Sequence, residues 1–520
     1  MIQTMRKSIL HILMMGLGAT VVLTSSCKKD IIERNQEYPA LAPASQDLNA
    51  DTWQPVLTAS STFTVATPDA ITSPNYLADL NEIKSYQRNL TRQQRDIITY
   101  WSAGSVLRWN EILRELVAKH NLPPYQNDDG TYPAPSAANP LAYPLFPFSN
   151  PPYAARAYAY VSAAQYDALV QAWKFKKQFN RPAPYKNDAA IQALVPKSDL
   201  PSYPSEDAVV YGVTAKMMEL LFPGDLDYIR QKAAEEKLYR IMAGANTRSD
   251  LDAGESLGKQ VADVFLARAR TDKAGAAIGN KDLWDKLESD KRATGQIPWI
   301  SLELPKRPPM LPLFTKVTPF LFSPENVVAL RPAAPYSTGS PEFQKEADEV
   351  LQMSMNRSRE HERIVAFWAD GVGTVTPPGH WNSIAADEFV KHNYSEVRWA
   401  RNLALLNMAE MDAAIVCWDA KYYYFNPRPT QFMFNIKTLT GIPNFPSYTS
   451  GHSNFSGAAA TILGYLVPEK KQAFMDMANE AAMSRLYGAI HYRSDCEVGL
   501  QTGVKVGEYA VARAKADGAN

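Results

Sequence analysis

Residues 446–452 read Pro-Ser-Tyr-Thr-Ser-Gly-His, and residues 201–207 read Pro-Ser-Tyr-Pro-Ser-Glu-Asp. The two stretches lie 245 positions apart (446 against 201), and this spacing relates further pairs, without a gap, across about a hundred residues. Chance matches do not hold one register over that length, so the chain is predicted to contain two copies of one unit. The pairs include Asp167 and Asp412, Trp173 and Trp418, Lys176 and Lys421, Gly212 and Gly457, Arg240 and Arg485, and Asp250 and Asp495.

Helix signals flank the two copies, whereas alternating strand patterns of useful length are scarce. Thr91 and Gln94 form a capping-box pattern, and Ser340 precedes a proline suited to the first helical position. The sequence therefore predicts an all-α fold of two helical bundles related by internal duplication, at residues 76–267 and 341–520. Residues 268–340, which contain nine prolines between Pro298 and Pro335, are expected to form a Pro-rich connection wrapped over the surface.

The amino-acid composition argues against some classes of function and indicates how the fold is stabilised. The 54 Lys+Arg balance the 54 Asp+Glu, which argues against nucleic-acid binding through a general basic field. Hydrophobic residues make up 46% of the chain, enough for a sizeable core. Only 3 Cys occur in 520 residues, so packing and not disulfides must stabilise the fold, and Cys417 and Cys496 are expected to be buried free thiols.

The first 26 residues have the pattern of a bacterial lipoprotein signal peptide. Arg6 and Lys7 precede an apolar run that is too short to span a bilayer, and Cys27 follows it. Cys27 is then the lipidated first residue, and residues 27–75 form a tether and an extended segment. This predicts a Gram-negative cell-envelope lipoprotein, periplasmic or anchored to the outer membrane, that contacts membrane only through its lipid. The alternative is an ordinary secretory signal with an incidental cysteine.

The second copy carries the residues suited to chemistry. Three cations, a hydroxyl and a glycine could cradle a multiply charged tetrahedral oxyanion. His452 can transfer a proton near neutral pH, and His491 has Asp495 four residues on, a spacing that would place both on one helical face. A bend or helix start is expected near Gly488. The predicted cradle consists of Lys421, Arg428, Ser450, Gly451 and Arg485.

The first copy lacks most of these groups. Ala183 stands opposite Arg428, and Asn246 stands opposite His491. Glu206 and Asp207 occupy the positions of the glycine and histidine that follow Ser450 in the second copy. The first copy is therefore expected to be structural, and one active site is expected in the second half.

The spacing Lys421-(six residues)-Arg428-Pro429, the triplet Ser450-Gly451-His452 and the run Ser484-Arg485-(five residues)-His491-(three residues)-Asp495 resemble three motifs. These are the motifs of the superfamily of type 2 phosphatidic acid phosphatases and vanadium-dependent haloperoxidases. The resemblance implies an all-α fold, phosphate or vanadate bound by the cradle, and His452 as acid/base. It also implies that His491 is the phosphatase nucleophile or the axial ligand of vanadium. Thr449 departs from the proline usual at that position.

Residues 75–515 look like the longer haloperoxidase branch of this superfamily. Trp418 and Phe445 stand where fungal-type chloroperoxidases have them, and both are pocket or halide-site candidates. The stretch from Phe367 to Trp381 is similar to bacterial members. In it, Asp370 is a candidate partner for a site arginine and His380 a candidate for the entrance, although a helix-end carboxylate and a loop histidine are equally good interpretations.

Three functions are compatible with these patterns. The first is halide oxidation by hydrogen peroxide at a vanadate cofactor held at His491. The second is hydrolysis of phosphomonoesters through a phosphohistidine, without a cofactor. The third is a non-catalytic, glycan-binding surface lipoprotein. The paired-bundle length and the pair Trp418 and Phe445 favour the haloperoxidase, and the oligomeric state stays open.

Overall fold

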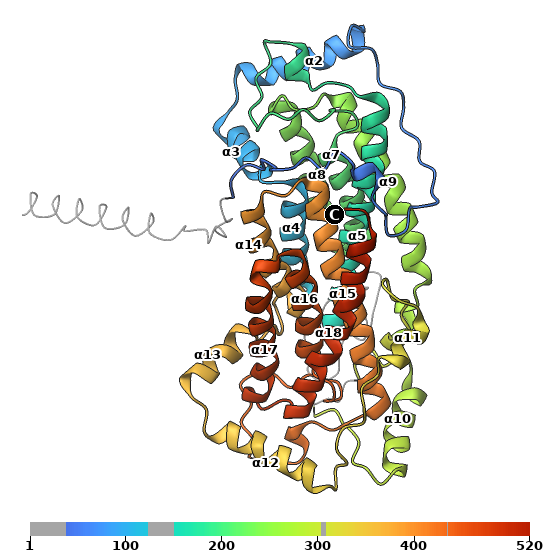
Figure 1. Ribbon diagram of the computed structural model, residues 1–520, viewed down its shortest axis with the longest axis vertical. Coiled ribbons are helices and arrows are strands. Elements are labelled where there is room, and N and C mark those ends of the chain that lie inside the picture. Colours follow the sequence, from blue (N-terminus) through green and yellow to red (C-terminus); the bar gives the residue numbers. More distant parts are fainter. Residues whose placement is uncertain (1–37, 123–149, 303–307, 434, 520) are drawn as a thin grey trace, which may run out of the picture. The chain divides into compact units, whose positions relative to one another are not determined.

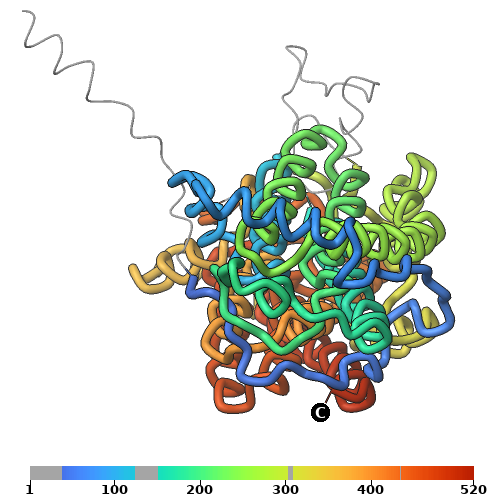
Figure 2. The backbone as a smooth tube through the Cα atoms, turned by 90° about the horizontal axis from the view of Figure 1, so that it is seen from above, coloured from blue at the N-terminus to red at the C-terminus, as the bar shows by residue number. Residues whose placement is uncertain are grey.

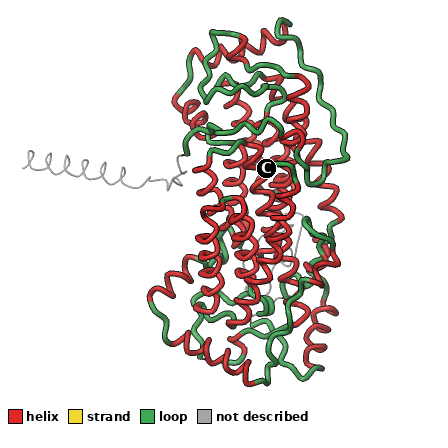
Figure 3. The backbone as a smooth tube through the Cα atoms, viewed as in Figure 1, coloured by secondary structure: helices red, strands yellow, loops and turns green. Residues whose placement is uncertain are grey.

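The computed structural model describes residues 38–122, 150–302, 308–433 and 435–519. The expected signal peptide and Cys27 lie outside the described residues. Residues 40–520 form one compact unit, which holds every helix discussed below. In the described ranges all regular structure is helical, which confirms the all-α prediction (Figure 3). None of the described helices is both long and apolar enough to cross a membrane.

Four long helices of the first copy recur in the second with the spacing seen in the sequence (Figure 1). Each begins and ends 245 positions before its counterpart, as an internal duplication predicts. The first set is α5 (Pro151–Phe179), α7 (Glu206–Leu221), α8 (Leu226–Met242) and α9 (Arg248–Thr271). The second set is α15 (Glu396–Tyr424), α16 (Gly451–Leu466), α17 (Lys471–Tyr487) and α18 (Arg493–Ala516).

The two copies pack against each other through α5 and α15, which are almost entirely buried. Asn407 Nδ2 on α15 donates a hydrogen bond of 2.8 Å to Ser162 Oγ on α5. These two residues are counterparts in the repeat, so equivalent positions meet as they do across a two-fold axis. The copies therefore share one core, and Figure 2 shows the backbone of both copies from above.

Shorter helices precede each copy. Those before the first are α2 (Pro74–Arg88), α3 (Arg92–Trp101) and α4 (Ser105–His120), and those before the second are α12 (Pro341–Met355), α13 (Arg359–Phe367) and α14 (Thr376–Phe389). Both expected N-terminal signals are present. Thr91 and Gln94 form the reciprocal capping box of α3, and Ser340 caps α12 by accepting the Phe343 N–H.

The Pro-rich connection is more than a surface wrap. It contains α10 (Lys281–Ala293) and α11 (Pro324–Ala329), and it buries Trp299 and Phe314. The buried Asp412 on α15 accepts the backbone N–H groups of Phe320 and Leu321 at 3.0 and 2.8 Å. Its first-copy counterpart, Asp167, binds the backbone of residues 56–58 in the same way. The repeated aspartates thus fasten an extended segment to each copy.

Candidate active site

A cavity of about 840 Å³ lies among the C-terminal end of α15, the N-terminus of α16 and the turn between α17 and α18. The structure brings most of the predicted residues to its wall. Lys421, Ser450 and Asp495 are fully buried next to wall residues. The predicted residues on the wall are Asp370, Trp418, Arg428, Phe445, Gly451, His452, Arg485 and His491.

His491 lies in the turn between two helices. α17 ends at Tyr487, and α18 begins at Arg493, so the expected interruption near Gly488 is confirmed. His491 Nδ1 lies 2.9 Å from Asp495 Oδ2. The expectation that both share a helical face is wrong, because His491 precedes the helix while Asp495 sits in its first turn and accepts the Tyr492 N–H.

The imidazole of His491 is held neutral. Burial lowers its pKa well below the ordinary value, and the charges of Arg428 and Lys421 lower it further. Since Asp495 accepts the proton on Nδ1, the lone pair is on Nε2, which lies 3.3 Å from Arg428 Nη1. His491 therefore presents a ring nitrogen to the cavity that can ligate a metal or attack an electrophile.

Two buried arginines are fixed by backbone carbonyls. Arg428 donates to the Phe445 and Ile490 carbonyls at 2.9 and 2.8 Å, and Arg485 donates to that of Trp368 at 2.6 Å. Neither forms an ion pair within the described ranges, and Arg428 Nη2 is buried without a hydrogen-bond partner there. Burial lowers the pKa of Arg428 to about 9 and that of Arg485 to about 10, so both remain charged at neutral pH.

Lys421, Ser450 and Gly451 form the remainder of the cradle. Lys421 Nζ donates to the Pro446 and Ser447 carbonyls at 2.8 and 2.9 Å. Burial lowers its pKa to about 7, and a bound anion would favour the charged form, which has a third proton for that anion. Ser450 is the N-cap of α16, and Gly451 is its first residue, so the first N–H groups of the helix lack intrahelical partners. A Cβ on Gly451 would come no closer than 3.8 Å to its neighbours, so packing does not require glycine there.

Asp370 lies close to two histidines, His380 and His452. The expectation that Asp370 pairs with a site arginine is wrong: Asp370 Oδ1 lies 2.9 Å from His380 Nδ1, and Oδ2 lies 3.6 Å from His452 Nε2. Burial opposes ionisation of Asp370, but the hydrogen bond with His380 and the proximity of His452 lower its pKa. His380 is not among the described residues that line the cavity, and it stacks on Trp368 with ring centroids 4.6 Å apart.

Burial also sets the charge of His452. It lowers the pKa of this imidazole to about 4, and the positive charge of Arg485 acts in the same direction. The ring is therefore neutral at neutral pH before an anion binds, although Asp370 favours its charged form. A bound oxyanion would raise this pKa, which suits a group that must hold a proton close to the anion.

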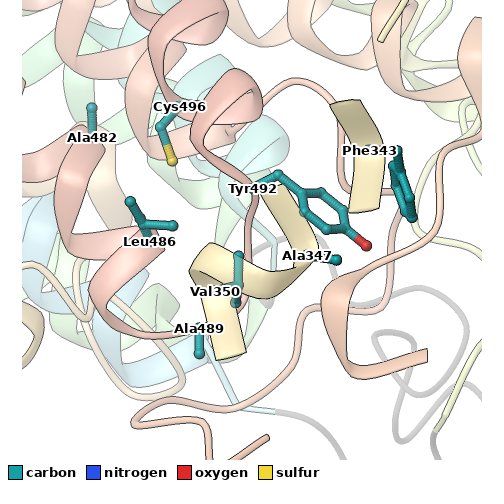
Figure 4. Close-up of a cluster of buried hydrophobic side chains, with 8 residues drawn as sticks. All are labelled: Phe343, Ala347, Val350, Ala482, Leu486, Ala489, Tyr492 and Cys496. Atoms are coloured by element: carbon teal, nitrogen blue, oxygen red, sulfur yellow. The ribbon is translucent and has the colours of Figure 1, made fainter. Parts of the chain in front are cut away.

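A small apolar cluster supports the His491 turn from behind. It joins α12 to α17 and α18, and Tyr492 and Ala489 belong to it (Figure 4). Ala489 and Tyr492 flank the Ile490–His491 dipeptide. Their burial therefore restricts the orientation of the His491 imidazole. The cluster consists of Phe343, Ala347, Val350, Ala482, Leu486, Ala489, Tyr492 and Cys496. Cys496 and Cys417 are both buried free thiols, as expected.

In the equivalent region of the first copy, carboxylates neutralise the cations. Lys176 Nζ lies 3.7 Å from Glu206 Oε2, and Arg240 Nε lies 3.3 Å from Asp207 Oδ2. Glu206 and Asp207 replace Gly451 and His452, so side-chain carboxylates stand where the second copy is open to a free anion. The first copy therefore offers no cradle of uncompensated cations.

Ser447 is a site residue that the sequence analysis did not single out. Its Oγ donates to Asp495 Oδ2 at 2.5 Å and lies 3.3 Å from His491 Nδ1. The signal for it was present, because Ser447 and Ser202 are a matched pair in the repeated Pro-Ser-Tyr motif.

The donor set fits an oxyanion such as vanadate or phosphate. Among the residues that the structure describes, neither Arg428 nor Arg485 has a carboxylate partner, and Arg428 Nη2 is a buried donor with no hydrogen-bond partner. Buried cations of this kind are stable only when an anion compensates them. The neutral Nε2 of His491 supplies the nitrogen that a vanadate centre requires.

Comparison with known proteins agrees with this geometry. Residues 402–513 match the family model of the PAP2 superfamily. These matched residues, called the PAP2 segment, lie in the second copy. This PAP2 segment runs from α15 into α18 and includes the cradle, both histidines and Asp495. No curated protein matches the chain.

A solved structure shares the fold of most of the chain. A bacterial vanadium-dependent iodoperoxidase superposes with a TM-score of 0.58 at 22% identity, covering 82% of this chain and 97% of that one. A bacterial vanadium-dependent chloroperoxidase in its holo form gives a TM-score of 0.49 at 14% identity, covering 71% and 92%. The iodoperoxidase likeness shows that the fold extends well beyond the PAP2 segment.

Proposed function

We propose that this chain is a vanadium-dependent haloperoxidase that oxidises halide with hydrogen peroxide. The observation that carries the proposal is the pair of buried guanidinium groups without carboxylate partners beside the neutral Nε2 of His491. The fold shared with a vanadium-dependent iodoperoxidase supports it. The PAP2 segment supports an oxyanion as the bound species.

Different residues of the chain would bind vanadate, compensate its charge and transfer protons. Vanadate, when bound, supplies the centre at which hydrogen peroxide is activated towards halide. Nε2 of His491 would ligate vanadium, while Arg428, Arg485, Lys421 and the N-terminus of α16 compensate the charge on the oxygens. Neutral His452 would accept a proton and return it as the reaction proceeds, with Asp370 beside Nε2 stabilising its charged form. Trp418 and Phe445, whose ring centroids lie 5.1 Å apart, exclude water from one side.

A phosphatase remains the second candidate, because a neutral His491 facing an oxyanion cradle also suits attack on phosphorus. Nε2 would form a bond to phosphorus, the ester oxygen would leave with a proton from His452, and water would then cleave the phosphohistidine. The same groups serve both reactions, so the residues of the cradle do not separate them.

A paired assay separates the two. Vanadate-loaded protein should brominate phenol red in the presence of bromide and hydrogen peroxide, and His491→Ala should abolish this. His392→Ala is the matched control, since His392 pairs with Glu469 away from the cavity. Hydrolysis of p-nitrophenyl phosphate by the metal-free protein, inhibited by vanadate and without oxidation of chloride, bromide or iodide, would assign the phosphatase instead.

A further inference from the structure

The first copy also has a pocket at the place equivalent to the active site. It measures about 230 Å³, and the N-terminal end of α15 forms part of its wall. Residues 195–198 and Leu200 line this pocket, and their counterparts 245 positions later, residues 440–443 and Phe445, line the active-site cavity. Both copies therefore have a pocket at the same place in the repeat, although the side chains around it differ.

The charged side chains that line the first-copy pocket balance in sign within the described residues. Glu396 is already used, because it accepts the N–H groups of Ser105 and Val106 at 2.6 and 3.2 Å. Lys197 is exposed to solvent. Two cations and two carboxylates remain in the pocket. The full set of charged lining residues is Lys176, Lys197, Glu206, Asp207, Arg240 and Glu396.

The two remaining carboxylates have unused acceptor capacity. Glu206 Oε2 lies 3.7 Å from Lys176 Nζ, which is too far for a hydrogen bond. Asp207 Oδ2 lies 3.3 Å from Arg240 Nε, but the single Nε proton is donated to Asn246 Oδ1 at 2.8 Å. Neither carboxylate accepts a hydrogen bond within the described ranges. The side chains of Glu206 and Asp207 are 15% and 10% exposed, so a small molecule in the pocket can reach them.

Arg240 is a cation with an unused donor in the same pocket. Its Nη1 donates to Tyr239 Oη at 3.4 Å, whereas Nη2 has no acceptor in the part of the chain that the structure describes. Burial opposes the charge of Arg240, but the negative charge of Asp207 raises its pKa, so the guanidinium is charged at neutral pH. The side chain is 20% exposed. A ligand in this pocket therefore meets a free cationic donor and free carboxylate acceptors.

The size and the charges of the pocket restrict the ligand. A volume of about 230 Å³ holds about seven or eight water molecules at about 30 Å³ each, so a molecule with a similar number of non-hydrogen atoms fits. A simple anion would be repelled by Glu206 and Asp207, and a simple cation would be repelled by Arg240. A molecule that carries both charges satisfies the donor and the acceptors at once.

We propose that the first-copy pocket binds a small zwitterionic amino acid. The ammonium group donates to Glu206 and Asp207, and the carboxylate accepts from Arg240. Glu206 and Asp207 stand at the positions of Gly451 and His452, so the residues that exclude an oxyanion from the first copy also supply the acceptors for the ammonium. This site is separate from the active-site cavity, and it does not depend on the proposed haloperoxidase function.

Binding is tested first on the unaltered full-length protein without vanadate. L-alanine and L-serine are titrated by calorimetry at pH 7, and one saturable site per chain is expected. N-acetyl-L-alanine lacks the ammonium and L-alaninamide lacks the carboxylate, so each should bind at least about tenfold more weakly than L-alanine. If the amide binds as well as L-alanine, the pocket is a cation site, and if the acetylated compound does, it is an anion site. Either result would overturn the proposal.

Competition with inorganic phosphate distinguishes the two copies. Phosphate in excess occupies the cradle of the second copy and should leave the affinity for L-alanine unchanged. A loss of affinity in phosphate would place the amino acid in the active-site cavity, and the proposal would then be wrong whatever reaction the chain catalyses.

Two pairs of variants locate the site. Asp207→Asn should weaken L-alanine binding at least about tenfold, whereas Asp199→Asn, at a side chain that is 95% exposed and outside the pocket, should not. Arg240→Gln should have a similar effect, and Arg230→Gln, at an exposed position on the same helix, is its matched control. One phosphate per chain in each variant verifies that the fold is intact. Unchanged affinity in both pocket variants, or no saturable site in the unaltered protein, would refute the assignment.

Discussion

Nδ1 of His491 lies 2.9 Å from Oδ2 of Asp495, so the carboxylate determines which ring nitrogen faces the cavity. Asp495→Asn keeps the shape of the side chain but removes the charge that holds the Nδ1 proton. We expect vanadate affinity to fall by about 10–100-fold, as is usual when the partner of a metal-ligating histidine is removed. Calorimetric titration with vanadate measures this, and unchanged affinity would show that Asp495 only caps α18.

Oxyanion binding should occur once per chain. Lys176 and Arg240 of the first copy face Glu206 and Asp207, whereas Arg428 and Arg485 have no carboxylate partner in the described residues. Vanadate or phosphate should therefore bind at one tight site, and Arg428→Ala or Arg485→Ala should abolish binding. Arg240→Ala is the matched control and should leave the stoichiometry at one. A tight site that survives the second-copy substitutions would contradict this assignment.

The charge of Asp370 should control the pH dependence that arises from His452. The carboxylate favours the protonated imidazole, so Asp370→Asn should lower the pKa of His452 below its value of about 4 in the anion-free protein. The limb of the pH–rate profile due to His452 should move to lower pH by the same amount. His380→Gln retains a donor for Asp370 and should shift the limb less. Profiles that coincide for all three proteins would exclude this role.

Glu410 should make the folded state less stable as pH rises. It lies in the centre of α15, fully buried, and burial raises its pKa well above the ordinary value. The protonated form is favoured in the folded state, so its stabilising effect is complete below the pKa of the unfolded chain, near 4.3, and is lost as pH rises towards the folded pKa.

Glu410→Gln removes this dependence, and the first copy already has glutamine, Gln165, at the equivalent position. We expect the variant to gain stability relative to wild type by about 1.4 kcal/mol per pH unit over this range. Urea unfolding at pH 5, 6 and 7 measures the difference. A constant difference across these values would show that Glu410 is ionised in the folded protein.

We also propose that Cys27 anchors the chain to the cell envelope. The apolar run that precedes it is too short to span a bilayer, and the mature chain would be held only by its lipid. Cys27→Ser should release the protein from the membrane fraction. If the variant still sediments with membranes after a high-salt wash, the anchor lies elsewhere.

The sequence predicted the fold correctly in the region that is repeated at a spacing of 245 residues. The 245-residue spacing predicted the paired helices, because buried residues such as Asp167 and Asp412 have the same role in both copies. The ion pairs of Lys176 and Arg240 in the first copy were not predicted. It misplaced Asp370, since that residue adopts a φ of 44° in the loop after α13 and turns towards the histidines. Single-residue loop conformations of this kind leave no periodic signal in the sequence.

The apolar wall of the cavity could not be predicted from the sequence for a related reason. Trp299 and Met310 come from the Pro-rich connection, far from Val372 and Leu439 in the chain. Trp299, Met310 and Val372 lie outside the repeated region, so the repeat gives no information about them. Only folding brings them together over the cradle, so local spacing could place the oxyanion but not the walls that surround it.

Asn407 and Ser162 occupy equivalent positions in the two copies and form a hydrogen bond with each other. The two copies therefore meet as the two subunits of a homodimer do, although they belong to one chain. In a free homodimer, every substitution appears in both subunits, and assembly weakens on dilution. Fusion removes both constraints. The first half carries Glu206, Asp207 and Asn246 where the second carries Gly451, His452 and His491, and it still covers α15. The two halves stay together however dilute the protein becomes.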